Sequence, residues 1–100
     1  TFSFSDEQTR SAMREVFLSS RYILDPHTAV GYLGASSSSF AGTKVILSTA
    51  HPAKFKQTVE ETLQVEIPLP EALEYCQSKP QIVEDIPADF AVLKDILLRV

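Results

Sequence analysis

Polar and apolar residues alternate with a helical period in the first third of the chain. Ser5 can cap a helix, and Gln8 follows three residues later, which is the spacing of a capping box. Apolar side chains then recur on one helix face, at Ala12, Met13, Val16 and Phe17. The pattern predicts a first helix that packs this apolar stripe into a core.

Asp25 and Pro26 mark the start of a second helix, because an aspartate cap followed by proline in the first turn favours helix initiation. This helix would end in the serine run of residues 36–39. Gly31 and Gly34 lie inside it, and glycine costs roughly 1 kcal/mol relative to alanine in a helix interior. We therefore expect another backbone to approach this helix closely.

Residues 44–49 (Lys-Val-Ile-Leu-Ser-Thr) form a largely apolar run that is rich in β-branched side chains. Such a run is typical of a buried strand. Pro52 would open a third helix directly after it. A helix, a strand and a helix in succession indicate an α/β fold, in which ligands bind at the carboxyl ends of strands. Residues 48–51 therefore lie where a site is expected.

The last third is divided by prolines and predicts shorter elements. We expect a short helix over residues 70–77, an irregular stretch at residues 81–83 and a terminal helix over residues 87–98. One strand cannot make a sheet. The chain therefore either contains strands that the pattern conceals or contributes to a sheet whose other strands lie elsewhere, which favours a fragment of a larger protein.

Composition narrows the classes of function. The 100 residues carry a net charge of -4, which argues against a nucleic-acid partner. No apolar run reaches the roughly 20 residues of a membrane span. The single cysteine, Cys76, is expected to be a half-buried residue of a helix, and one free cysteine suits a reducing compartment. We expect a cytoplasmic protein that neither binds nucleic acid nor enters a membrane.

The histidines do not indicate a metal site. His27 and His51 are the only two, and their spacing, with or without Asp25, fits no metal motif. Ser48 with His51 and Asp25 could suggest a hydrolase, but the Gly-x-Ser-x-Gly elbow is absent. The segment of Asp25, His27 and Thr28 is either a helix cap with a buried face or a helix start that faces a ligand cavity.

Thr49 places a hydroxyl at the end of the predicted strand, and the small Ala50 beside it leaves room for a flat ligand. The hydroxyl could bind such a ligand, or it could be satisfied by the backbone. Spacing alone leaves both interpretations open.

Three blocks of the chain resemble the longer, bacterial and fungal class of threonine synthases. They are residues 24–34 (LDPHTAVGYLG), residues 47–55 (LSTAHPAKF) and residues 86–93 (IPADFAVL). The blocks occur in the expected order and together extend over nearly the whole chain.

The resemblance implies an α/β fold: the helix-rich C-terminal part of an enzyme of the pyridoxal-phosphate (PLP) β-family, or fold type II, with about one buried strand. Residues 5–64 would be a helix-helix-strand-helix portion of the catalytic core, and residues 65–100 a C-terminal helical extension. Enzymes of this family convert O-phospho-L-homoserine and water to L-threonine and phosphate.

The resemblance also assigns site residues. Thr49 would hydrogen-bond the pyridine nitrogen of PLP, with Ser48, Ala50 and His51 as neighbours of the ring edge. A neutral hydroxyl there would moderate the electron-withdrawing power of the ring. The family's Schiff-base lysine and glycine-rich phosphate loop have no counterpart in this chain, and Lys54 is expected to be a surface charge. No catalytic residue is therefore expected within these 100 residues.

Residues 1–100 alone are consequently expected to be inactive and not to bind PLP. The expected partners are O-phospho-L-homoserine, as substrate of the full enzyme, and the N-terminal part of the same chain. Apolar surface left uncovered could drive self-association. Two alternatives stay open: a catalytically inactive, threonine-synthase-like binding module, and, from composition alone, a free-standing small α/β domain.

Overall fold

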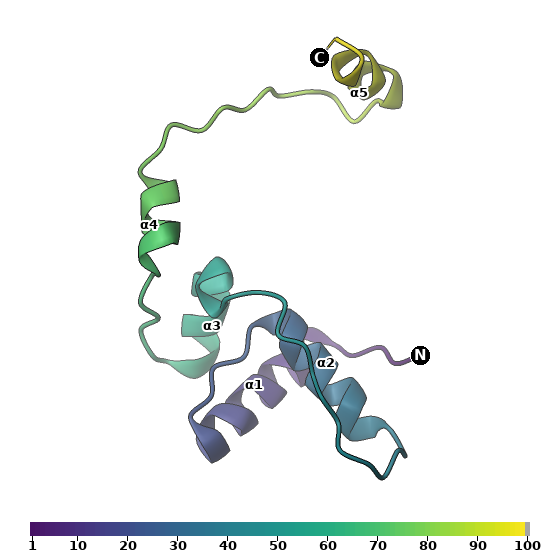
Figure 1. Cartoon of the computed structure of the whole chain (residues 1–100), viewed down its shortest axis with the longest axis vertical. Coiled ribbons are helices and arrows are strands. Elements are labelled where there is room, and N and C mark those ends of the chain that lie inside the picture. Colours follow the sequence, from purple (N-terminus) through teal and green to yellow (C-terminus); the bar gives the residue numbers. More distant parts are fainter. Residues whose placement is uncertain (100) are drawn as a thin grey trace. The chain divides into compact units, whose positions relative to one another are not determined.

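The first described helix begins at the capping box that the sequence predicts. In the computed structural model, which describes residues 1–99, α1 spans Asp6–Ser20 (Figure 1). The main-chain amide of Ser5 donates to Gln8 Oε1 at 2.8 Å, and the amide of Gln8 donates to Ser5 Oγ at 3.3 Å. The helix ends at Arg21, whose left-handed backbone (φ 60°) closes the last turn.

Five further helical elements follow within residues 1–99. They are α2 (Pro26–Ser37), the 3-10 helix η1 (Pro52–Phe55), α3 (Lys56–Leu63), α4 (Glu71–Gln77) and α5 (Phe90–Leu97). The second helix starts at the predicted cap, since Asp25 Oδ1 accepts the amides of His27 and Thr28 at 2.9 and 3.3 Å. The third predicted helix is also present, as η1 continued by α3.

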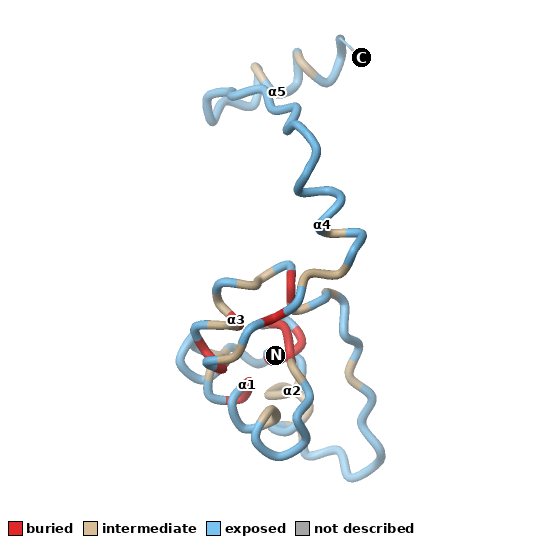
Figure 2. The backbone as a smooth tube through the Cα atoms, turned by 90° about the vertical axis from the view of Figure 1, so that its left-hand side faces the viewer, coloured by how far each residue is buried: buried red, intermediate tan, exposed pale blue. Residues whose placement is uncertain are grey.

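The chain divides into two compact units, one spanning Thr1–Pro70 and the other beginning at Glu71. The first unit holds the core, in which α1 packs against α2 and α3. Figure 2 shows the buried positions gathered there. The buried apolar side chains come from every helix of the unit and from two connections: Ala12, Met13, Leu24, Ala29, Ala53, Val59, Leu63 and Ile67.

The buried strand predicted over residues 44–49 is not formed within residues 1–99. Residues 38–51 form neither helix nor strand, and Val45 and Leu47 are 83% and 77% exposed. No main-chain hydrogen bond links residues 41–50 to other backbone groups of residues 1–99. A strand needs neighbouring strands to satisfy its amides and carbonyls, and the described chain contains none. The expected α/β architecture is therefore absent from residues 1–99, which are helical.

Within residues 71–99 the second unit consists of short helices and contains no buried residue. The helix predicted from Pro87 begins instead at Phe90, because Asp89 caps it by accepting the amide of Ala91 at 2.7 Å. Neither α4 nor α5 contains a buried residue. Cys76 is accordingly exposed, which corrects the half-buried environment expected for it. None of the helices within residues 1–99 has the length and hydrophobicity that a membrane span requires.

Met13 is fully buried in the core of the first unit, so we expect its truncation to reduce the stability of the fold strongly. Met13→Ala should lower the free energy of unfolding, measured in urea, by about 2–5 kcal/mol, because it leaves a cavity beneath α1. Met13→Leu, which nearly conserves volume, is the control and should cost less than about 1.5 kcal/mol. Equal losses for the two variants would contradict the packing described here.

Candidate functional site

Residues 44–49 lie in an extended segment that runs back along α2 (Figure 1). Lys44 Nζ donates to the carbonyl oxygens of Ala35 and Ser38, at 2.7 and 2.9 Å, at the end of that helix. Two residues further on, Ile46 lies against Gly31: a Cβ atom built on Gly31 would be 3.3 Å from Ile46 Cγ2. The close approach expected at this glycine is therefore made by a side chain and not by another backbone.

A third contact joins the segment to the first turn of α2. The Oγ atoms of Ser48 and Thr28 lie 3.4 Å apart. As the segment advances through Lys44, Ile46 and Ser48, its contacts move backward along α2. The extended segment is thus antiparallel to the helix, with its even-numbered side chains directed at one helix face.

The odd-numbered side chains of the segment consequently form an outward row, which consists of Val45, Leu47 and Thr49. All three are exposed, as are Lys44 and Ser48, whereas Ile46 is half-buried. Because successive side chains of an extended chain point to opposite sides, the contacts of Ser48 with α2 turn Thr49 away from it. Thr49 is therefore available to a group outside the first unit.

A polar cluster of buried Asp25 and Thr28 and exposed His27 lies where the segment meets α2. Asp25 is 1% exposed, and besides the two amides it accepts the hydroxyl hydrogen of Thr28 through Oδ2. His27 Nδ1 lies 3.5 Å from Asp25 Oδ1, and the His27 ring is 4.9 Å from the ring of Phe55. The helix cap and the burial of Asp25 and Thr28 are thus both observed.

His51 ends the segment and starts η1. Its Nδ1 accepts the amide of Ala53 at 3.1 Å, so the side chain acts as the cap of that short helix. An accepting Nδ1 places the proton of a neutral imidazole on Nε2. Lys54, three residues on, is exposed, as expected of a surface charge.

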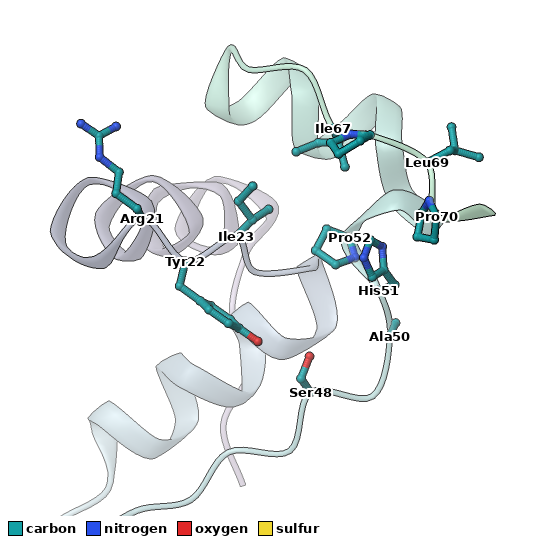
Figure 3. A pocket seen from close by; sticks show the side chains of 11 residues that line it. Arg21, Tyr22, Ile23, Ser48, Ala50, His51, Pro52, Ile67, Leu69 and Pro70 are labelled. Carbon is teal, nitrogen blue, oxygen red and sulfur yellow. The ribbon is translucent and has the colours of Figure 1, made fainter. Parts of the chain in front are cut away.

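A cavity of about 550 Å³ lies beside residues 48–52 (Figure 3). Ser48, Ala50 and His51 line it, whereas Thr49 does not. The opposite wall comes from the α1–α2 connection and from the chain after α3, including Tyr22 and Ile67. In Figure 3 the hydroxyl groups of Tyr22 and Ser48 both point into the space between them.

The cavity can offer hydroxyl groups and an imidazole to a ligand within largely apolar walls. Arg21 is the only lysine or arginine among its lining residues. Within residues 1–99 no group of three or more histidine, cysteine or acidic side chains is placed to hold a metal ion. The first unit thus presents two faces at one segment: a cavity lined by Ser48 and Ala50, and an open face with Thr49.

Comparison with known proteins identifies the family. Residues 28–97 match the family model described as the C-terminal part of threonine synthase. The chain belongs to the threonine synthase family. Over 95 residues it is 40% identical to the threonine synthase of Serratia marcescens. The aligned region covers 94% of this chain and 22% of that protein.

Solved threonine synthases share the arrangement of these helices. The crystal structure of the Escherichia coli enzyme superposes with a TM-score of 0.81 at 37% identity, covering 94% of this chain and 22% of the other. The PLP-bound enzyme from Brucella melitensis superposes with a TM-score of 0.69 at 27% identity, covering 91% and 20%. The chain therefore spans about a fifth of the length of the threonine synthases it resembles.

The sequence predicted a site at residues 48–51 but not that Ser48 faces α2 while Thr49 faces away from it. Of the four predicted site residues, Ser48, Ala50 and His51 line the cavity and Thr49 does not. The even-numbered and the odd-numbered side chains of residues 44–49 both include apolar and polar residues. The sequence therefore shows no alternation of polarity that would predict which side chains face α2. Tyr22 and Ile67, which line the cavity, were likewise not singled out.

The contact between Ile46 and α2 predicts different effects for the two helix glycines. Gly34→Ala should raise the free energy of unfolding by up to about 1 kcal/mol, because alanine favours helix and the nearest atom, in Phe2, is 3.9 Å away. Gly31→Ala should raise the free energy of unfolding clearly less, because the added methyl group must displace Ile46. Urea unfolding of both variants tests this. Equal stabilisation would mean that the segment is not packed on the helix.

Proposed function

We propose that this chain supplies the C-terminal part of a threonine synthase, which converts O-phospho-L-homoserine and water to L-threonine and phosphate. The match of residues 28–97 to the threonine synthase C-terminal family is the observation that carries the proposal. Identity above one third to full-length enzymes extends over nearly the whole chain. The activity requires the rest of the enzyme, because this chain spans only 22% of its relatives.

PLP is the cofactor proposed for the complete enzyme, as in the PLP-bound relative from Brucella melitensis. When bound, PLP supplies an electron sink for reactions at an amino acid. The residues of the segment fit such a group. Thr49 offers a neutral hydroxyl on the open face, and the small side chain of Ala50 beside it does not crowd a flat ring.

Thr49 is proposed to donate or accept one hydrogen bond at the pyridine nitrogen of the cofactor. Its exposure supports this role, because a residue that contacts a group held by the rest of the enzyme must be uncovered in this part alone. Ser48, Ala50 and His51 remain predicted neighbours of the ring edge. The chain contributes no Schiff-base lysine in this proposal, so residues 1–100 alone should be inactive.

The exposed backbone and the outward row support assembly with the rest of a fold type II enzyme. The amides and carbonyls of residues 41–50 make no main-chain hydrogen bonds within the described chain, and they can pair with a neighbouring strand. Val45 and Leu47 would then be buried by the layer that packs on that face of the sheet. We propose that residues 44–49 become a strand of a sheet formed by the preceding part of the enzyme.

The function is tested with the complete chain that contains these residues. The purified protein should show the near-visible absorbance of lysine-bound PLP and release phosphate from O-phospho-L-homoserine. Residues 1–100 alone should show neither, because the proposed lysine is outside them. A complete protein with neither absorbance nor phosphate release would instead identify a catalytically inactive binding module.

The role of Thr49 is tested by Thr49→Val in the complete chain. This variant should retain bound cofactor but lose about tenfold in kcat, the effect of one hydrogen bond of roughly 1.4 kcal/mol. Thr49→Ser keeps the hydroxyl and is the matched control, with kcat close to that of the parent. Unchanged turnover in Thr49→Val would refute the contact.

A further inference from the structure

Thr28 is the residue through which the first turn of α2 holds the extended segment. Its side chain is buried, and its hydroxyl hydrogen is donated to Asp25 Oδ2. The same oxygen lies 3.4 Å from Ser48 Oγ, 20 residues later in the chain. A hydroxyl carries one hydrogen and two lone pairs. With the hydrogen of Thr28 committed to the carboxylate, Ser48 is the donor in the second bond.

Asp25 gives this chain of hydrogen bonds a fixed end. The carboxylate is 1% exposed, and its Oδ1 atom accepts the amides of His27 and Thr28 at 2.9 and 3.3 Å. The carboxylate cannot rotate without breaking these bonds to the helix. Its second oxygen, Oδ2, therefore fixes the direction of the Thr28 hydroxyl. The helix cap itself needs only Oδ1, so the bond through Oδ2 is additional to capping.

Ser48 is the contact with α2 that lies closest to Thr49. Lys44 and Ile46 hold the segment farther from it, and the backbone between residues 41 and 50 has no main-chain partner in the described chain. On the other side, His51 is fixed by its bond to the amide of Ala53. Within the described chain, residues 49 and 50 are therefore held in place by the contact of Ser48 with Thr28 and by the bond of His51 to Ala53.

We propose that Thr28 and Asp25 are positioning residues that set the backbone of residues 48–51 and thereby place the hydroxyl of Thr49. The consequence for catalysis rests on the role proposed above for Thr49. In this proposal both residues act through Ser48. One carboxylate thereby serves two purposes: one oxygen starts a helix and the other orients a segment that is distant in sequence.

The proposal is tested by hydrogen exchange in the cofactor-free, full-length protein. Thr28→Val keeps the branched shape of the side chain but removes the hydroxyl, and Thr28→Ser keeps the hydroxyl. Thr28→Val should accelerate exchange roughly two- to tenfold in a peptide covering residues 44–51, as expected for one lost hydrogen bond. Exchange in α1 should not change, and Thr28→Ser should retain the parent rate. Equal exchange in the two variants would overturn the proposal.

A second variant removes the same bond from the exposed side, in case Thr28→Val fails to fold. Ser48→Ala should accelerate exchange in residues 44–51 to a similar extent. The double variant Thr28→Val/Ser48→Ala should be no faster than Thr28→Val alone, because the two changes break one shared bond. Fully additive effects, or no effect of Ser48→Ala, would refute the link.

Turnover of the PLP-loaded enzyme separates this proposal from the role of Thr49. Thr28→Val should lower kcat and have little further effect in a Thr49→Val background, because both act on one hydroxyl. Should Thr49→Val leave turnover unchanged, the cofactor contact fails, while the exchange result still decides whether Thr28 holds the segment. An undiminished loss from Thr28→Val in the Thr49→Val background would show that Thr28 acts by another route.

Discussion

The carboxylate of Asp25 is the group on which the arrangement of the first unit depends. A buried charge is costly unless it is fully hydrogen-bonded. Asp25 is compensated by two main-chain amides, by the hydroxyl of Thr28 and by the positive end of the α2 dipole. These partners determine where α2 begins. Because Leu24 and Ala29 on either side are buried, the cap also helps to fix how α2 packs on the core.

The extended segment of residues 44–49 packs along α2, the helix that starts at this cap. Lys44, Ile46 and Ser48 contact α2 at its end, its middle and its first turn respectively. The extended conformation of residues 44–49 is therefore maintained by side chains and not by a ladder of main-chain bonds. This leaves both a row of side chains and the backbone itself available to the remainder of a threonine synthase.

The apolar side chains left uncovered agree with a chain that completes a larger protein. In the first unit Val45 and Leu47 are exposed, and in the second Phe90 and Leu97 are exposed on α5. Side chains of this size are normally removed from water because burial of each stabilises a fold by roughly 1.5–3 kcal/mol. Their pattern is what an interior surface of a whole enzyme would show when only one of its parts is present.

The amino-acid sequence by itself determined the starts of α1 and α2 and indicated the family. Ser5 with Gln8, and Asp25 with Pro26, are local signals whose hydrogen bonds close within three residues, so each helix start could be located without tertiary information. The blocks around Asp25 and Thr49 indicated threonine synthase for the same reason: they are contiguous in the chain.

Only the tertiary structure decided the state of residues 44–49 and the direction of Thr49. The β-branched run indicated a buried strand, but burial and strand pairing depend on partners distant in sequence, and residues 1–99 provide none. The contact of Ser48 with Thr28 crosses 20 residues and follows no periodic pattern. Because side chains alternate along an extended chain, that single long-range contact decides that Ser48 faces α2 and Thr49 faces outward.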